Sequence, residues 1–304
     1  MDKILIIGGA TASGKTNLSL KISEFADIEI ISADSMQIYK YMDIGSAKPS
    51  IAERSEVFHH MIDIKTPVQD FDARDFEINS KKIIKKIIRK GKIPVIVGGT
   101  GFYIEALLYG LPVLQKKNNK IRDFYEKMIE EKGKIAVFEL LKSKWPERAE
   151  KLHENDTRRI IRSLEIFDSG DKENFEYNKN ENFNFLFYYI NTDRESLENR
   201  VKKRVENMFK NGLIEEVDFI LKKTGFGIQA SQGIGYKEVI PFFEKGKISD
   251  LEKIKEEIIL HTLQFSKRQR TFFKNKFKKM IFLDLCGINK YQIKEDIENY
   301  FYGG

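Results

Sequence analysis

A glycine-rich segment near the start of the chain constrains its fold most. Residues 9–16 read Gly-Ala-Thr-Ala-Ser-Gly-Lys-Thr, fit the pattern G-x-x-x-x-G-K-[ST] and follow the apolar run Ile4–Ile7. This context predicts a strand, a tight turn and a helix whose free N-terminal N–H groups face a phosphate. A chance glycine turn is the alternative, and the strand–loop–helix context argues against it.

This segment, called the phosphate loop below, predicts binding of a diphosphate or triphosphate without saying which. Lys15 would reach the outer phosphates, and the hydroxyl of Thr16 would hold a Mg²⁺ ion. The residues predicted to bind the phosphates are Gly9, Thr11, Ala12, Ser13, Gly14, Lys15 and Thr16, with Thr16 also at the metal.

Length and charge limit the class of protein. The chain has 304 residues, enough for one large domain or two smaller ones, and a net charge of +7. That charge favours an anionic partner such as RNA, DNA or a phosphorylated substrate, although lysine also simply covers protein surfaces. Cys286 is the only cysteine, which excludes an internal disulfide and a cysteine-based zinc site. We find no signal peptide and no apolar run as long as a membrane span, and expect a soluble cytoplasmic protein.

Strands and helices alternate in the first hundred residues. An alternating order favours a parallel sheet covered on both faces, so we predict an α/β fold with a P-loop NTPase-like parallel sheet. The predicted strands are Lys3–Ile7, Glu29–Ser32 and Ile93–Val97, and the predicted helices are Asn17–Phe25 and Ala73–Lys90.

The middle of the chain differs in character. Residues 116–182 are charged and helical in pattern, with polar tracts at both ends, and we predict an inserted all-helical subdomain. Residues 1–115 and 183–304 would then form the core. The later core elements predicted are a strand at Phe183–Ile190, a helix from the Thr192–Asp193 cap to Asn211, a helix at Ile248–Lys276 and a strand at Lys279–Leu285.

Ligands of parallel sheets bind at the carboxyl ends of the strands, where three loops of this chain fall. They are Gly8–Thr16, Ala33–Ser35 and Gly98–Gly101. Asp34 could hold Mg²⁺ through water or accept a proton from a nucleophile, and capping the following segment is the alternative. The third strand ends in glycine and threonine, which makes an ordinary ATPase arrangement less natural. Thr100 offers a hydroxyl to a phosphate oxygen.

Three other segments carry weaker signals. The pair His59–His60 is unsuited to one metal, because adjacent side chains point to opposite sides, and we expect at most one of them to make a buried hydrogen bond. Arg158, Arg159 and Arg162 follow a helix cap at Asp156 and suit RNA phosphates or a solvated face. Residues 267–274 interleave basic and aromatic side chains, which suits nucleic acid or a surface helix with an aromatic core side.

Taken together, these segments resemble the bacterial tRNA dimethylallyltransferases, also called tRNA isopentenyltransferases. The run from Asp34 to Pro49 followed by His-His-x-x-Asp is the most specific part of the resemblance. The matching segments are Gly9–Thr16, Ser32–Gln37, Tyr41–Pro49, His59–Asp63, Val97–Tyr103, Asn155–Glu165, Gly235–Tyr236 and Lys267–Thr271. No C-terminal zinc finger is expected, given the single cysteine.

The resemblance implies transfer of a dimethylallyl group from dimethylallyl diphosphate to N6 of adenosine 37 of tRNA. Diphosphate leaves, so the phosphate loop would hold a leaving group, with Mg²⁺ as the cofactor. Asp34 matches the family's base, and Thr100 its threonine near the bridging oxygen. Arg122 lies where the family carries a diphosphate-binding arginine, although the local match is loose.

The resemblance also implies contact with the tRNA anticodon stem-loop. The target base would be flipped into a channel and contacted by residues 35–37, and the inserted subdomain would bind the anticodon stem. The tRNAs would be those reading codons that begin with U, and we expect a monomer. The residues implied to bind tRNA are Asp34, Ser35, Met36, Gln37, Thr100, Arg122, Arg158, Arg159, Ile160, Arg162, Gly235, Tyr236, Arg268 and Gln269.

Two other functions use the same residues. A small-molecule or nucleoside kinase would place ATP on Lys15 and Thr16, with Asp34 activating a substrate hydroxyl. A non-catalytic, nucleotide-regulated RNA-binding protein would use Asp34 as a switch. The kinase alternative explains neither the basic C-terminal helix nor the insertion.

Overall fold

The chain divides into two compact units. A computed structural model describes residues 1–112, 118–171, 182–244, 251–284, 287 and 289–303. Unit 1 combines Met1–Tyr109 with Glu181–Gly304, and unit 2 is Gly110–Asn180. The predicted boundary at 115/116 lies outside the described residues.

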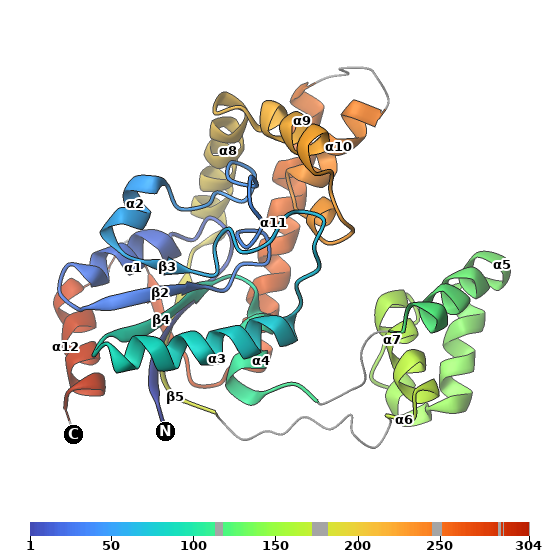
Figure 1. Cartoon of the computed structure of the whole chain (residues 1–304), viewed down its shortest axis with the longest axis horizontal. Helices are drawn as coiled ribbons and strands as arrows, with labels where there is room; N and C mark the ends of the chain where they lie inside the picture. Colours follow the sequence, from blue (N-terminus) through green and yellow to red (C-terminus); the bar gives the residue numbers. More distant parts are fainter. Residues whose placement is uncertain (113–117, 172–181, 245–250, 285–286, 288, 304) are drawn as a thin grey trace. The chain divides into compact units, whose positions relative to one another are not determined.

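A six-stranded sheet forms the centre of unit 1 (Figure 1). Every paired strand is parallel, in the order β3-β2-β4-β1-β5-β6, which confirms the predicted α/β class. The two-residue edge strand β3 was not predicted, because two residues are too few for a periodic pattern. The strands are β1 (Lys3–Gly9), β2 (Ile28–Ser32), β3 (His59–His60), β4 (Ile93–Gly98), β5 (Asn184–Asn191) and β6 (Ile281–Asp284).

Helices cover both faces of the sheet, as predicted. On one face, buried strand residues such as Leu5 and Val95 form a core with Leu18 of α1 and Ile293 of α12. On the other face α3 contacts β2 and β4, and α11 contacts β1. The helices are α1 (Lys15–Ser23), α3 (Ala73–Arg89), α4 (Gly101–Tyr109), α11 (Leu251–Lys276) and α12 (Lys290–Phe301). Residue 248, where we predicted the start of α11, is outside the described residues.

Beyond the carboxyl ends of the strands, α8 contacts α9 and α11, and α10 also contacts α9 and α11 (Figure 1). The predicted helix after the Asp193 cap is confirmed as α8 (Arg194–Lys210), whose cap accepts from the N–H of Ser196. Helix α9 (Leu213–Lys223) begins after Gly212, which has a positive φ of 95°. A 3₁₀ turn η2 (Ala230–Gln232) leads into α10 (Tyr236–Glu244), and α2 (Ile51–Glu56) precedes β3.

Unit 2 is helical in its described part. It contains α5 (Asn119–Lys144), which is kinked at Gly133, then α6 (Pro146–Ala149) and α7 (Thr157–Asp168). Its core joins the later part of α5 to α7 through Leu141, Trp145 and Leu164 among others. Within the described residues, no helix combines the length and apolar character that crossing a bilayer would need.

We expect Gly98→Ala to lower the free energy of unfolding by at least about 2 kcal/mol, because an added Cβ would lie 2.1 Å from the Ala33 carbonyl oxygen. Both atoms belong to backbone that the sheet holds in place. Urea unfolding measures the change. The matched control is Gly287→Ala, where a Cβ would meet no atom of the described residues within 4 Å. Equal stability of the two variants would contradict the close approach of the loops.

Candidate active site

The phosphate loop leaves β1 at Gly9 and enters α1 at Lys15. Ala12 and Gly14 have positive φ angles of 63° and 94°, and the N–H of Ser13 donates to the Ala10 carbonyl at 3.2 Å. No side chain among the described residues caps the first turn of α1. The N–H groups of that turn therefore remain available to a phosphate, because they have no acceptor within the helix.

Lys15 is held inside this loop. Its Nζ donates to the carbonyl oxygens of Gly9 at 3.0 Å and Ala10 at 2.7 Å. Burial lowers the pKa of Lys15 to about 8, although the charge of Asp34 raises it, and the charge of Arg204 lowers it further. A charged lysine is therefore held at a cost that a bound anion would offset.

A buried hydroxyl also lacks a partner here. Within the described residues, the Oγ of Ser13 is buried and takes part in no hydrogen bond. Buried polar atoms are normally paired, so an unpaired hydroxyl is suited to a hydrogen bond with a ligand. The phosphate loop thus offers N–H groups, a cation and a hydroxyl to one anion.

Asp34 follows β2 and sits beside Thr100. Its Oδ1 accepts from the N–H of Met36 at 2.8 Å and, more weakly, of Gln37 at 3.4 Å. Residues 35–38 form a turn and not a helix, so these bonds cap a turn, and the expected helix cap is absent there. No group in the described part of the chain donates to Oδ2, which leaves that oxygen for chemistry.

Two hydrogen bonds join the loop after β4 to the loop after β2. The Thr100 hydroxyl accepts from the N–H of Ser35 at 3.1 Å, and the Thr100 N–H donates to the Ala33 carbonyl at 3.1 Å. Because β4 lies between β1 and β2, the three predicted loops meet at one edge of the sheet.

Gln269 of α11 ties the phosphate loop to the loop after β4. Its Oε1 accepts from the N–H of Thr11 at 2.9 Å, and its Nε2 donates to the Gly99 carbonyl at 2.8 Å. The side chain is 6% exposed. This corrects the implied tRNA contact, because Gln269 lies on the buried face of α11 with Phe273, and its amide is engaged inside the protein.

Two arginines of α8, absent from the sequence prediction, approach the same site. Arg200 donates to the Ser13 carbonyl at 3.3 Å. Arg204 is one helical turn further along, and burial lowers its pKa while the charge of Asp34 raises it. Among the described residues, no acceptor pairs with its guanidinium. A sequence signal for Arg204 exists. It lies beside Val201 and Val205, which form part of the buried stripe of α8, and an arginine at the border of such a stripe is rarely buried without a partner.

Two further residues implied to bind tRNA are part of the protein's own interior. Tyr236 is fully buried, and its hydroxyl donates to Glu216 at 2.7 Å. The N–H of Gly235 donates to Glu238 at 2.7 Å. Arg268, by contrast, is exposed, with its guanidinium 5.9 Å from the ring centre of Phe265. Packing of α10 against α11 and α9 decides these positions, which no local pattern reveals.

The aromatic side chains near the end of α11 also face inward. Phe273 is fully buried and packs against Phe187, and a Cβ on Gly101 would lie 2.5 Å from the ring of Phe272. Of the two alternatives for residues 267–274, the structure favours a helix with an aromatic core side.

In unit 2, the arginines differ in their surroundings. Arg122 and Arg162 each donate to buried Glu165 at 2.8 Å. Burial alone would raise the pKa of Glu165, but these hydrogen bonds and one from the Asn118 N–H lower it. Arg158 and Arg159 are exposed, whereas Ile160, implied to touch tRNA, is 1% exposed and lies in the core.

Both adjacent histidines make hydrogen bonds, each only partly buried, so neither is the buried bond that we expected of at most one of them. His60 Nε2 lies 2.8 Å from Glu29 Oε2, and His59 Nδ1 lies 2.7 Å from the Val57 carbonyl. Burial lowers the pKa of His59. The bond of His60 to Glu29 joins the edge strand β3 to β2, whereas the bond of His59 stays within its own segment.

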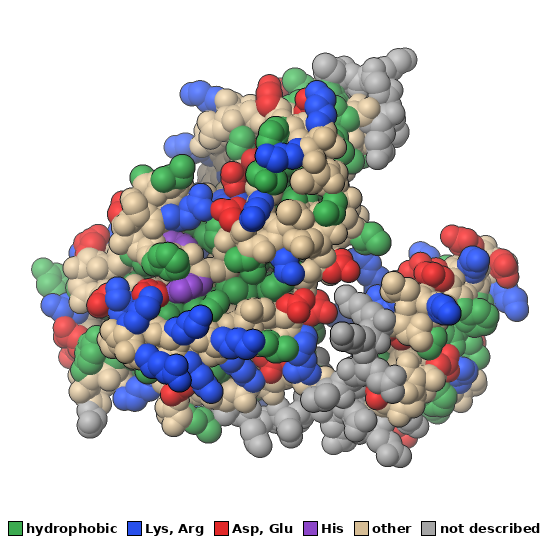
Figure 2. All heavy atoms as spheres, viewed as in Figure 1, with side chains coloured by type: hydrophobic (Ala, Val, Ile, Leu, Met, Phe, Trp, Pro, Cys, Tyr) green, Lys and Arg blue, Asp and Glu red, His purple; other side chains and the backbone are tan. Residues whose placement is uncertain are grey.

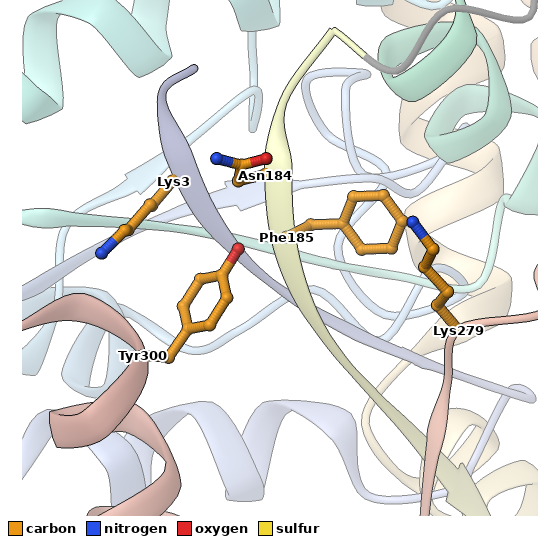
Figure 3. A pocket seen from close by; sticks show the side chains of 5 residues that line it. All are labelled: Lys3, Asn184, Phe185, Lys279 and Tyr300. Atoms are coloured by element: carbon orange, nitrogen blue, oxygen red, sulfur yellow. The ribbon is translucent and has the colours of Figure 1, made fainter. Parts of the chain in front are cut away.

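A cavity of about 210 Å³ lies at the opposite edge of the sheet (Figure 3). Lys3 and Asn184 are the first residues of β1 and β5, so the cavity is at the amino ends of the strands. The Nζ of Lys3 is 5.7 Å from the centre of the Tyr300 ring. Nothing in this cavity reaches the phosphate loop, which lies at the other end of β1.

Basic side chains gather over α3 on one face of unit 1 (Figure 2). Lys81 pairs with Glu77, and Lys90 pairs with Glu29, each at 2.8 Å. Four other cations of α3 are exposed and form no ion pair with a described carboxylate: Lys82, Lys85, Lys86 and Arg89. This face adds to the positive charge that the composition indicates.

Comparison with known proteins agrees with the family resemblance of the sequence. The profile of the IPP transferase family matches residues 37–276. The chain belongs to the IPP transferase family. A tRNA dimethylallyltransferase of Sulfurihydrogenibium sp. is 42% identical over 280 residues, covering 90% of this chain and 89% of that protein.

Solved structures agree with this assignment. The tRNA isopentenylpyrophosphate transferase of Staphylococcus epidermidis is 35% identical with a TM-score of 0.70, covering 98% of both chains. A eukaryotic dimethylallyltransferase acting on tRNA is 28% identical with a TM-score of 0.82, covering 100% of this chain and 80% of that one.

We expect Gln269→Leu to weaken binding of inorganic pyrophosphate about tenfold, because the phosphate loop loses its tie to Gly99. Calorimetric titration measures the affinity. Gln264→Leu is the matched control, since Gln264 is exposed on the same helix. Unchanged affinity in Gln269→Leu would show that the loop is rigid without this amide.

We expect affinity for a diphosphate ester to fall above pH 8. The pKa of Lys15 is about 8 without ligand, and a bound anion raises it, so binding then takes up a proton. Affinity should be constant just below pH 8 and fall up to about tenfold per pH unit above it. Titrations between pH 7 and 10 test this. Lys15→Met should bind weakly with a flat profile, and a flat wild-type profile would contradict the lowered pKa.

Proposed function

We propose that this protein transfers the dimethylallyl group from dimethylallyl diphosphate to N6 of adenosine 37 in tRNA, releasing diphosphate. Membership of the IPP transferase family supports tRNA prenylation. The observation that carries the proposal is the meeting of a phosphate cradle with Asp34, whose Oδ2 accepts no hydrogen bond from a described residue. Substitution at the allyl carbon requires a base, here Asp34, close to a bound leaving group, here the diphosphate.

The phosphate loop binds the leaving group in this proposal. Negative charge grows on the diphosphate as the bond from carbon to oxygen breaks. The N–H groups at the start of α1 and the cation of Lys15 stabilise that charge. Arg204 supplies a second cation from α8, and Thr100 lies near the bridging oxygen. Arg122, in unit 2, is proposed as a diphosphate ligand from the family resemblance alone.

Asp34 acts as the base. The exocyclic amine of adenine is a poor nucleophile, because its lone pair is delocalised into the ring. Oδ2 accepts a hydrogen bond and then the proton from N6 as the new bond from nitrogen to carbon forms. Met36 and Gln37 donate to Oδ1, which orients the carboxylate.

The residues present suit a Mg²⁺ ion shared with the substrate. Within the described residues, no cluster of three His, Cys, Asp or Glu side chains could hold a metal alone. Mg²⁺ commonly binds through one or two protein oxygens together with phosphate oxygens, and the Thr16 hydroxyl at the start of α1 provides one. When bound, the ion would neutralise charge on the diphosphate.

The tRNA would bind with its anticodon stem-loop over this edge of the sheet. A base in the stacked loop must be flipped out to reach Asp34, and Ser35, Met36 and Gln37 would contact it. Exposed Arg158, Arg159 and Arg268 suit phosphate contacts, which dominate RNA affinity. We propose tRNAs reading codons that begin with U as substrates.

A transfer assay separates this function from its alternatives. The protein is incubated with labelled dimethylallyl diphosphate, Mg²⁺ and unmodified tRNA, without ATP. Label on adenosine 37 supports the proposal. An absolute requirement for ATP, with a phosphorylated product, supports a kinase instead, and RNA binding without chemistry supports a regulated RNA-binding protein.

We expect Asp34→Asn to lower kcat by about 10²–10⁴-fold, because the amide cannot take the proton. Asparagine still accepts from the Met36 N–H, so the loop and the RNA affinity should be preserved. Single-turnover kinetics and RNA titration measure both quantities. Near-normal turnover in this variant would remove Asp34 from the mechanism.

A further inference from the structure

One carboxylate of α9 accepts four hydrogen bonds from outside its helix. Oε2 of Glu216 accepts from the N–H groups of Asp43 at 2.9 Å and Ile44 at 2.7 Å. Oε1 accepts from the N–H of Gly45 at 3.1 Å and from the hydroxyl of Tyr236 at 2.7 Å. Three successive N–H groups facing one anion are a strong, charge-assisted attachment.

The same face of α9 contacts residue 41. Glu216, Phe219 and Lys223 are spaced to lie on one side of a helix. The ring of Phe219 packs edge-on against Tyr41 with centres 5.7 Å apart, and Lys223 Nζ lies 4.4 Å from the centre of the Tyr41 ring. Tyr41 has a positive φ of 69°, which is rare for a tyrosine and is maintained by these contacts.

Tyr236, the first residue of α10, contacts both Glu216 and the loop that Glu216 binds. A Cβ on Gly45 would lie 2.5 Å from the Tyr236 ring, and a Cβ on Gly233 would lie 2.7 Å from Met36 Sδ and 3.1 Å from the same ring. The ring thus packs between the loop of residues 41–47 and the turn that touches Met36. Its hydroxyl ends on Glu216.

The loop of residues 41–47 in turn contacts the segment that follows Asp34. The Ala47 carbonyl accepts from Gln37 Nε2 at 3.4 Å, and Ser32 Oγ donates to Gln37 Oε1 at 2.8 Å. Gln37 is therefore held at both ends of its amide. One of these ends depends on the loop that Glu216 holds.

We propose that Glu216 is a positioning residue, which holds residues 35–37 ready for the target base through the loop of residues 41–47 and Tyr236. This rests on the proposed function, in which residues 35–37 contact the flipped adenine. Glu216 touches no part of the phosphate loop. Its influence should therefore fall on RNA and leave the diphosphate unaffected.

The test is Glu216→Gln, which keeps the shape and removes the charge. However the new amide is turned, its NH₂ group faces at least one backbone N–H. We expect the Kd for an anticodon stem-loop RNA and its KM to rise about tenfold, while the KM for dimethylallyl diphosphate stays within about twofold. Amide hydrogen exchange at residues 43–45 should accelerate.

Glu215→Gln is the matched control, because Glu215 lies in the same first turn and is exposed. A double variant with Gln37→Ala tests the route: its loss of RNA affinity should be smaller than the sum of the losses in the two single variants. Additive losses, unchanged RNA affinity, or equal rises in both KM values with a lower Tm would each overturn the inference. Wild-type transfer activity reports on the proposed function separately, and RNA affinity and amide exchange need no turnover.

Discussion

Two cations, Lys15 and Arg204, lie close together at one edge of the sheet, and the rest of the site depends on the cost of burying them. Lys15 lies among backbone carbonyls with its pKa lowered to about 8, and Arg204 approaches from α8 without an acceptor among the described residues. Asp34 is the carboxylate that acts on both cations. Because the folded state binds protons at Lys15 less readily than the unfolded chain, this group opposes folding below pH 8, and stability rises as pH approaches 10.5. An anionic ligand offsets that penalty, so binding and stability are linked.

The functional groups of three loops lie close together because glycines let the backbone of these loops pack tightly against its neighbours. Glycine at position 98 lets β4 reach the Ala33 carbonyl, and glycine at position 8 leaves room for Phe187 and Phe273. Gln269 then joins the phosphate loop to the next loop with a buried amide. A buried amide stabilises the folded state only when its oxygen and its nitrogen both form hydrogen bonds, and both atoms of Gln269 do so.

Helices α8 and α9, beyond the carboxyl ends of the strands, contact different parts of the site. Helix α8 brings arginines to the phosphate side, while α9 holds the loop that follows Asp34 on the base side. In the proposed function, the diphosphate and the adenine would thus be held by different helices. This division follows the chemistry of the proposed reaction, in which the nucleophile and the leaving group lie on either side of the transferred carbon.

The sequence alone predicts the parallel sheet apart from β3, helices α1, α3, α8 and α11, the phosphate loop, and the position of Asp34 and Thr100 at one edge of the sheet. These follow from local patterns, since an apolar run, a glycine-rich turn and a cap each act within a few residues. The packing of distant elements, by contrast, turns Gln269, Tyr236 and Ile160 toward the interior, and turns Arg204 and Glu216 toward the loops of the site. The contacts of Glu216 with residues 43–45 join positions 171 to 173 apart in the chain, and those of Gln269 with Thr11 span 258. A helical pattern shows which residues share a face, but the packing of distant helices decides what that face meets.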